Sequence, residues 1–400
     1  MSESPNRHLS AHLRSAEQVL SHYPGGEPFP LYLRAFFRSN PKFGSRDRRV
    51  VSGLCYDSFR IGRTLADAPV RDRILAGHFL CAPDPAGLIA LERPEWLTVI
   101  DDSLEDRLEF LASACTGFQP EDIFPLPEEL SPDIDRKAFI RSHLIQPDLF
   151  IRLRPDRSVT MRQRIEDSGI PHRFIPPHGV ALPNGTDTSS LGVADRDFVI
   201  QDLSSQITAD FMPGPSQLPD RPRIWDACAG SGGKSILAHD RFANARLLVT
   251  DARESILANL KERFRTAGIR GYDVDRLDLT QNDKRKEGST PSGFHLVVAD
   301  VPCTGSGTWS RNPWEMQNVD LEVIGAYRSR QESILDRIMP SVGKGSYLLY
   351  ITCSAYRSEN EGMVEFMEAN SGLRVLRQDV LKGYLEKADT MFAALFTSTA

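Results

Sequence analysis

Residues 226–235 read Asp-Ala-Cys-Ala-Gly-Ser-Gly-Gly-Lys-Ser, a glycine-rich turn between a predicted strand and a predicted helix. We expect the strand over residues 223–228 and the helix over residues 233–241. Glycines at such a turn let the backbone approach a ligand closely, and the amino end of a helix favours a negatively charged group. The turn therefore predicts a small-molecule site at the end of this strand.

Strands and helices continue to alternate after the turn. We expect further strands over residues 247–251, 275–279, 295–301 and 347–352, and helices over residues 254–267, 321–339 and 358–370. This alternation requires crossover connections, so it predicts an α/β fold with a parallel sheet and helices on both faces. In such sheets the ligand lies beyond the carboxyl ends of the strands. The chemistry is therefore expected near residues 226–234, 251, 278, 300–305 and 352–354.

The glycine-rich turn has two interpretations. Gly233-Lys234-Ser235 matches the end of a phosphate-binding P-loop, with Asp300 as the downstream acidic residue, but that motif requires glycine where Cys228 stands. The second interpretation is the nucleoside-binding turn of a methyltransferase-like sheet. It predicts an acidic residue at the end of the next strand to hold ribose hydroxyls, and Asp251 stands there. The turn favours the second interpretation and leaves the first open.

Six cysteines lie at positions 55, 81, 115, 228, 303 and 353, and no two form a Cys-x-x-Cys pair. This number and spacing disfavour a disulfide scaffold or a zinc element, so we expect free thiols. Cys303 and Cys353 each follow a buried strand, in the runs DVPCTGSG and YITCS. Both thiols are therefore expected on the ligand side of the sheet, beside Asp300. Cys55, Cys81 and Cys115 are expected to be core residues.

Three runs, DACAGSGGKS, DVPCTGSG and YITCS, resemble the signature motifs of the Sun/Fmu-type (RsmB-like) RNA cytosine-5 methyltransferases. Upstream, residues 149–154 and 198–206 resemble the pre-catalytic segment of that family. Residues 44–49 and the helix after them resemble its NusB-type helical RNA-binding domain. The resemblance implies a Rossmann-like class I methyltransferase sheet, preceded by a small α+β segment and an all-helical NusB-like N-terminal domain.

The resemblance also implies roles at the strand ends. Carbon 5 of cytosine is a poor nucleophile, and a thiolate that adds at carbon 6 makes it able to attack S-adenosylmethionine. Cys353 is implied as that nucleophile, and Cys303 as the thiol that assists elimination. Asp300 is implied to hydrogen-bond the ring-nitrogen edge of the base. No metal is expected.

The same resemblance implies S-adenosylmethionine as the methyl donor and assigns residues to it. They are Cys228, Ala229, Gly230, Ser231, Gly232, Gly233 and Lys234 at the methionine part, Asp251 at the ribose, Asp278 at the adenine edge, and Asp300. The chain departs from the family pattern in having Gly230-Ser231 for Ala-Pro. It also has Ile256 and Arg263 where an arginine and an asparagine are usual. These departures bear on donor binding rather than on catalysis.

The net charge of −6 argues against binding nucleic acid by bulk positive charge, but the average conceals blocks. Residues 30–73 carry ten basic and four acidic residues, and residues 136–173 carry nine and four. Residues 84–135 carry two basic and fourteen acidic residues. The basic blocks are candidate RNA surfaces, with solvated helix faces as the alternative. The candidate contacts are Arg46, Arg48, Arg49, Arg152 and Arg154, and Trp309 and Trp314 are candidates for base stacking or for packing.

Proline-rich stretches at residues 118–132 and 213–222 suggest domain boundaries. We expect a helical NusB-like domain over residues 1–117, a linker over 118–147, a small α+β pre-catalytic subdomain over 148–218, and a methyltransferase domain over 219–400. No apolar run reaches the roughly 18 residues of a membrane span. The amino terminus lacks the apolar core of a secretory signal, so we expect a cytosolic protein, and a monomer.

The sequence therefore predicts an S-adenosylmethionine-dependent RNA cytosine-5 methyltransferase that acts on ribosomal RNA through a cysteine adduct. Three alternatives stay open. They are a transfer RNA substrate, a P-loop nucleotide hydrolase, and a non-catalytic RNA-binding assembly factor.

Overall fold

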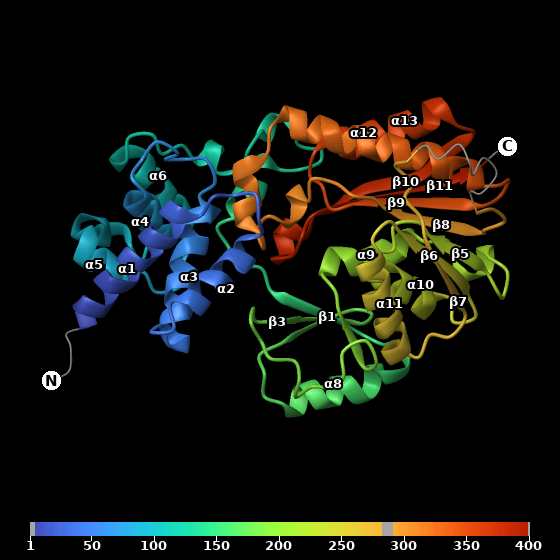
Figure 1. The fold of residues 1–400 in the computed structure, drawn as a ribbon, viewed down its shortest axis with the longest axis horizontal. Coiled ribbons are helices and arrows are strands. Elements are labelled where there is room, and N and C mark those ends of the chain that lie inside the picture. The colour runs from blue at the N-terminus through green and yellow to red at the C-terminus, as the bar shows by residue number, and fades with distance from the viewer. Residues whose placement is uncertain (1–4, 282–290, 399–400) are drawn as a thin grey trace. The chain divides into compact units, whose positions relative to one another are not determined.

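The computed structural model describes residues 5–281 and 291–398, and the chain divides into two compact units (Figure 1). The first unit comprises Met1–Glu128, Asp135–Gln146 and Trp309–Asp320, and the second comprises the three remaining segments, Glu129–Ile134, Pro147–Thr308 and Leu321–Ala400. The predicted pre-catalytic subdomain thus belongs to the same compact unit as the predicted methyltransferase domain. Among the described helices, none combines the length and the apolar character that crossing a membrane requires.

The first unit is helical throughout its described residues. Its elements are α1 (Pro5–His22), α2 (Phe29–Ser39), α3 (Ser45–Arg60), α4 (Val70–Cys81), α5 (Ala86–Glu92), α6 (Leu104–Ala114) and α7 (Arg136–Ser142), with 3-10 turns η1 (Pro94–Val99), η2 (Pro120–Ile123), η3 (Pro127–Glu129) and η8 (Pro313–Asn318). In α3, Val51, Leu54, Cys55 and Phe59 recur at helical spacing and are buried. The apolar period of the sequence therefore packs this unit, and the predicted helical N-terminal region is confirmed.

The segment predicted as a linker, residues 118–147, is folded. It contains η2, η3 and α7, and Phe118, Phe124 and Phe139 are fully buried. The rings of Phe124 and Phe139 meet at 4.9 Å between centroids. A Cβ on Gly62 would lie 1.7 Å from the Ile123 carbonyl oxygen, so this segment packs directly on the helices. The prolines and acidic residues of this segment suggested a linker. Buried phenylalanines lie among them, and the sequence analysis did not take these into account.

The two candidate stacking residues belong to the core of the first unit. Trp309 is fully buried, and its ring lies 5.4 Å from that of Phe124. Trp314 packs edge-on against Tyr56 at 5.8 Å. Burial of these rings supports the packing interpretation of both tryptophans over base stacking.

The second unit begins with a small antiparallel sheet of order β2-β3-β1-β4. Its elements are β1 (Leu149–Leu153), η4 (Pro155–Arg157), α8 (Ser158–Asp167), β2 (Arg173–Ile175), β3 (Gly179–Leu182) and β4 (Phe198–Ile200), followed by α9 (Leu203–Phe211) and η5 (Pro215–Gln217). Ile151, Met161 and Ile165 form part of a compact hydrophobic cluster beneath this sheet. The sheet therefore has a core of its own inside the larger unit.

A seven-stranded sheet of order β10-β11-β9-β8-β5-β6-β7 forms the rest of the second unit. Its strands are β5 (Arg223–Asp226), β6 (Arg246–Asp251), β7 (Tyr272–Arg276), β8 (Leu296–Asp300), β9 (Tyr347–Thr352), β10 (Leu373–Leu381) and β11 (Met391–Ser398). The first five strands run parallel, whereas β11 runs antiparallel to both neighbours. Because the central strands are buried on both faces, they are almost entirely apolar.

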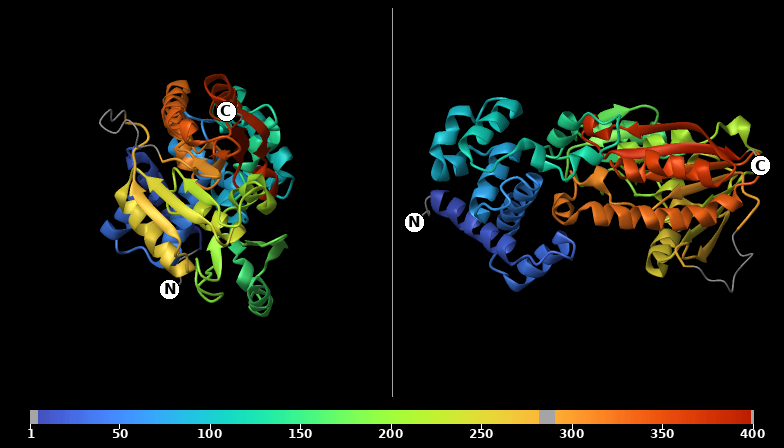
Figure 2. Two further views of the ribbon diagram at one scale, coloured as in Figure 1. Left: turned by 90° about the vertical axis from the view of Figure 1, so that its right-hand side faces the viewer. Right: turned by 90° about the horizontal axis from the view of Figure 1, so that it is seen from above.

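Helices cover both faces of this sheet, as predicted. Helices α12 (Leu321–Ile338) and α13 (Glu361–Asn370) lie on one face, and α10 (Gly233–Arg241) and α11 (Glu254–Ala267) lie on the other (Figures 1 and 2). Short turns η7 (Ser306–Thr308), η9 (Met339–Ser341), η10 (Arg357–Glu359) and η11 (Gly383–Glu386) connect the elements. The α/β fold class is therefore confirmed.

Two details of the sheet differ from the sequence prediction. Strand β7 ends at Arg276, three residues before the predicted end, so Asp278 lies on the loop that follows. The hairpin of β10 and β11 was not predicted. Strand β10 is mostly exposed and carries a register shift between Val375 and Arg377, so it has little of the apolar alternation that identifies a strand.

Candidate active site

A cavity of about 590 Å³ lies at the carboxyl ends of β5, β6 and β8. It brings together most of the residues that the sequence analysis assigned to the methyl donor, namely Cys228, Ala229, Gly230, Ser231, Gly233, Lys234, Asp251, Asp278 and Asp300, with Cys303 at its wall. Gly232 is the exception. Gly232 is the residue before helix α10 and has a φ of +88°. A Cβ at this position would lie 2.8 Å from Phe264, so the glycine allows the turn to pack on α11.

Asp251 anchors the glycine-rich turn from the end of β6. The backbone N–H of Gly230 donates to its Oδ2 atom at 3.0 Å. The side chain of Arg253 holds both carboxylate oxygens, at 3.0 and 3.1 Å. Burial raises the pKa of Asp251, but the hydrogen bonds from Arg253 and Gly230 outweigh burial and leave the pKa below its usual value. The sequence alone does not identify Arg253, because nothing in its position distinguishes it from a surface arginine.

Lys234 joins three elements at the cavity wall. Its Nζ atom donates to Ser205 Oγ on α9 at 2.7 Å and lies 3.1 Å from Asp300 Oδ2 at the end of β8. The next residue of α10, Ser235, donates to Asp226 Oδ2 at 2.5 Å. Burial raises the pKa of Asp226 to about 7. The turn is thus fixed by buried polar contacts on both of its sides.

The two candidate thiols meet although fifty positions separate them. The Sγ atoms of Cys303 and Cys353 lie 3.3 Å apart. The hydrogen bond with Cys353, followed by burial, raises the pKa of the Cys303 thiol well above its usual value. The Gly307 N–H donates to the Cys353 carbonyl at 2.9 Å, and a Cβ on Gly307 would lie 1.9 Å from the Thr390 carbonyl oxygen. Only a glycine at position 307 allows the backbone to come this close to Thr390.

Two other assigned residues occupy different surroundings. Asp278 accepts hydrogen bonds from the Thr280 backbone and hydroxyl at 2.9 and 2.6 Å, which lower its pKa, and it stays half-exposed at the cavity. The Cys228 thiol lies at the cavity floor, where burial raises its pKa far above the usual range. A neutral thiol at this position is a small, weakly polar wall element.

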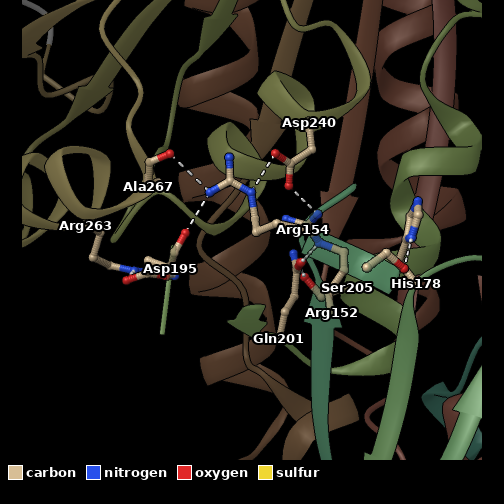
Figure 3. Close-up of polar contacts among 10 residues, drawn as sticks. Arg152, Arg154, His178, Asp195, Gln201, Ser205, Asp240, Arg263 and Ala267 are labelled. Atoms are coloured by element: carbon tan, nitrogen blue, oxygen red, sulfur yellow. Dashed lines mark hydrogen bonds and ion pairs between the residues drawn. The ribbon is translucent and has the colours of Figure 1, made fainter. Parts of the chain in front are cut away.

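Arg263 and Ser231, two of the departures from the family pattern, contact each other. The guanidinium of Arg263 donates to the carbonyl and the hydroxyl of Ser231, both at 3.0 Å. The same group makes a two-point pair with Asp195 at 2.7 and 3.0 Å (Figure 3). The serine of the turn therefore forms a hydrogen-bonded contact with the arginine of α11. The third departure, Ile256, lies half-buried on the same helix.

The candidate RNA contacts separate into two groups. Arg46, Arg48 and Arg49 are exposed on α3. Arg152 and Arg154 are buried, and both pair with Asp240, which is also buried (Figure 3). Arg154 further donates to the Asp195 carbonyl. The guanidinium groups of Arg152 and Arg154 hold the small sheet to α10, a geometry that disfavours contact with a phosphate, and their assignment to RNA stays a prediction.

One further residue that the sequence analysis did not identify is Glu359. It is fully buried and accepts hydrogen bonds from residues next to both candidate thiols. The available signal was a glutamate and an asparagine, Glu359-Asn360, six and seven positions after Cys353, which the sequence analysis included in the predicted helix over residues 358–370 without further assignment.

Comparisons with known proteins relate the chain to RNA methyltransferases. Residues 217–388 match the family model described as 16S rRNA methyltransferase RsmB/F. A ribosomal RNA small subunit methyltransferase B from Erwinia tasmaniensis is 24% identical over 382 residues, covering 82% of this chain and 83% of that protein. The protein of the same name from Pseudomonas syringae is 28% identical over 203 residues, and that match spans 50% of this chain and 43% of the relative.

Solved structures show the same fold. The crystal structure of PH0851 superimposes with a TM-score of 0.68 at 16% identity and covers 99% of both chains. The structure of NSun6 from Pyrococcus horikoshii with SFG has a TM-score of 0.56 at 15% identity, covering 68% of this chain and 97% of that one.

Proposed function

We propose that this chain, whose residues 217–388 match the RsmB/F methyltransferase family, transfers a methyl group from S-adenosylmethionine to carbon 5 of a cytosine in ribosomal RNA. The observation that carries this proposal is the pair of sulfur atoms, Cys303 and Cys353, 3.3 Å apart beside the cavity. A nucleotide hydrolase has no use for two adjacent thiols. Relatives named ribosomal RNA small subunit methyltransferase B support ribosomal RNA as the substrate class.

The cavity fits the donor in size and in chemistry. About 590 Å³ lies within the roughly 300–1,000 Å³ typical of small-molecule sites. At Gly230 and Gly233 an added Cβ would meet open space, so the backbone of the turn is accessible to a ligand. Asp251 would hold the ribose hydroxyls, with Asp278 toward the adenine. Arg253 is 64% exposed, so its side chain can release one oxygen of Asp251 without breaking buried packing.

The residues at the strand ends supply the chemistry of the base. When bound, S-adenosylmethionine supplies an electrophilic methyl group. Cys353 as thiolate would form a bond to carbon 6 of cytosine, and the electron pair of the 5,6 double bond would make carbon 5 nucleophilic. Cys303, in its thiolate form, would then take up the carbon-5 proton. The electron pair of the carbon–hydrogen bond would re-form the 5,6 double bond while the bond between sulfur and carbon 6 breaks and returns its electron pair to Cys353. Asp300, which keeps one oxygen on Lys234, would hydrogen-bond the ring-nitrogen edge.

The two cysteines have different expected phenotypes, which gives the test. Cys353→Ala should abolish both methyl transfer and any covalent protein–RNA adduct. Cys303→Ala should form the adduct and release it slowly, so that adduct accumulates on denaturing gels. Cys115→Ala, a half-buried thiol of the first unit, is the matched control and should behave as the wild type.

The assay uses the full chain with radiolabelled S-adenosylmethionine and either ribosomal or transfer RNA, followed by bisulfite sequencing of the product. If only transfer RNA is methylated, the proposal of a ribosomal RNA substrate is wrong and transfer RNA is the substrate. RNA binding with no methyl transfer by any variant would leave a non-catalytic assembly factor. Normal methylation by Cys353→Ala would contradict the assigned role of this thiol.

A further inference from the structure

A fully buried carboxylate, that of Glu359, lies between the loops that carry the two thiols. On one side it accepts from the Thr304 backbone N–H at 3.0 Å and from the Thr304 hydroxyl at 2.6 Å. On the other side it accepts from the Ser354 hydroxyl at 2.5 Å. Thr304 follows Cys303 and Ser354 follows Cys353, so a single side chain ties the neighbours of both thiols.

The hydroxyl groups also contact one another. Ser306 Oγ lies 3.1 Å from Ser354 Oγ and accepts from the Ala355 backbone N–H at 2.8 Å. Thr304 Oγ1 lies 3.3 Å from Ser354 Oγ. The result is a closed set of short polar contacts across the two loops, with Glu359 as the charged acceptor at its centre.

Helix α12 holds the carboxylate of Glu359, and strand β9 holds its backbone carbonyl. Gln331 on α12 donates to Glu359 Oε1 and to the Pro302 carbonyl, both at 3.0 Å. The Tyr350 hydroxyl on β9 donates to the Glu359 carbonyl at 2.7 Å. The backbone and the side chain of Glu359 are therefore both fixed, so the carboxylate cannot turn away from the thiol loops.

The chemistry of the partners favours the ionised form. Thr304, Ser354 and Gln331 supply four donors in all, and four donors saturate a carboxylate. Burial leaves the pKa of Glu359 above its usual value, although the bonds from Ser354, Thr304 and Gln331 oppose that rise. Bonds to a charged acceptor are the strong ones, so this contact stiffens the loops more than a neutral residue would.

We propose that Glu359 is a positioning residue that holds the sulfur atoms of Cys303 and Cys353 at the separation at which both reach one base. This inference rests on the proposed function for its meaning in catalysis, because addition and elimination at neighbouring ring carbons require two sulfurs in fixed register. The geometric part stands apart from methyl transfer and has a measurement of its own.

Disulfide formation measures the sulfur–sulfur distance without RNA or donor. The oxidant diamide removes two electrons and two protons from a pair of thiols, forms the S–S bond and is itself reduced to the hydrazine. The sulfurs need to move from 3.3 Å to about 2.05 Å, which is fast only while the loops stay in register. Mass spectrometry of the Cys303–Cys353 peptide gives the rate.

The variants are Glu359→Ala, which removes the carboxylate and its contacts with both thiol loops, and Glu359→Gln, which keeps the size of the side chain but only one of its two acceptor oxygens. Glu365→Gln, an exposed residue of α13, is the matched control. Disulfide formation in Glu359→Ala should slow at least about tenfold, kcat for methyl transfer should fall by a similar factor, and Glu359→Gln should be intermediate. The dissociation constant for S-adenosylmethionine should stay within about twofold, since no contact of Glu359 reaches the glycine-rich turn.

The outcomes are distinct. If Glu359→Gln lowers the melting temperature but keeps the wild-type disulfide rate and kcat well below that temperature, Glu359 is only structural and the proposal is overturned. This holds even where Glu359→Ala does not fold. If no variant and no wild-type protein transfers methyl groups, the proposed function fails, while slower disulfide formation in the Glu359 variants still upholds the positioning of the thiols.

Discussion

The ammonium of Lys234 and the carboxylate of Asp300 lie 3.1 Å apart, but they are buried to different degrees. The side chain of Lys234 is 8% exposed, whereas that of Asp300 is 31% exposed. The ammonium also donates to the hydroxyl of Ser205. Removing one partner of a buried ion pair lowers the free energy of unfolding most when water cannot hydrate the charge that remains. The pair should therefore respond unequally to the loss of either side.

We expect Asp300→Asn to destabilise the fold more than Lys234→Met. The first change leaves a buried ammonium without a counter-ion, at a cost of about 1–3 kcal/mol, whereas the second leaves a carboxylate that water reaches, at a cost below about 1 kcal/mol. Urea unfolding at pH 7 measures both. An equal or larger loss in Lys234→Met would show that Asp300 depends on its cation more than its exposure indicates.

Asp226 should make stability depend on pH. In the folded protein burial raises the pKa of Asp226 to about 7, whereas an unfolded aspartate titrates near 4. Between these values the folded state holds one more proton, so its stability falls as pH rises, by at most about 1.4 kcal/mol per pH unit. Above pH 7 this contribution is lost completely.

The matched variant is Asp226→Asn, which cannot titrate and still accepts from Ser235. Its stability relative to the wild type should increase from pH 5 to pH 7 and stay level from pH 7.5 to pH 8.5, measured by urea unfolding at each pH. A difference that stays constant from pH 5 to pH 8.5 would mean that Asp226 is ionised throughout.

The features that the sequence predicts well are those encoded by glycines and by the spacing of apolar residues. The glycine-rich turn, the buried strands and the thiols at the ends of β8 and β9 are local signals, because parallel strands place their carboxyl ends at one edge. The partner of a charged side chain is not local. Arg152 and Arg46 look alike in a count of basic residues, yet one lies in a buried pair with Asp240 and the other is exposed.

The same reason explains why Glu359 was missed. Its partners, Thr304 and Gln331, lie 55 and 28 positions away, and no spacing rule connects them. The hairpin of β10 and β11 was missed for another reason. Its strand β10 lies at the edge of the sheet, where most residues are exposed and the apolar pattern is weak, whereas β11 is a buried apolar run that the sequence analysis left unassigned.

The contact between Arg263 and Ser231 predicts energetic coupling between two departures from the family pattern. In a double-mutant cycle, Ser231→Ala and Arg263→Asn should show a coupling free energy of about 0.5–1.5 kcal/mol, the range of one side-chain hydrogen bond. Arg263→Asn alone should cost more, because Asp195 then loses its two-point partner. Chemical denaturation of the four proteins gives the cycle, and strictly additive effects would show that the contact contributes nothing.

The exposed arginines of α3 should carry the salt dependence of RNA binding. Arg46 and Arg49 are exposed in a stretch where Arg34, Arg38 and Lys42 are exposed as well. Each phosphate contact contributes about 0.7 to the slope of log K against log salt for a single strand. Arg46→Glu with Arg49→Glu should therefore weaken binding of a ribosomal RNA fragment and flatten the slope by about 1.4.

Arg152→Ala should act in the opposite way. It leaves Asp240 buried with one cation fewer, so unfolding should become easier by about 3–5 kcal/mol while the salt slope of the remaining folded protein stays unchanged. Arg221→Glu, an exposed arginine of the second unit, controls for the change in net charge. If the α3 double variant keeps the wild-type slope, or if Arg152→Ala changes the slope without loss of stability, RNA binding follows the second basic block after all.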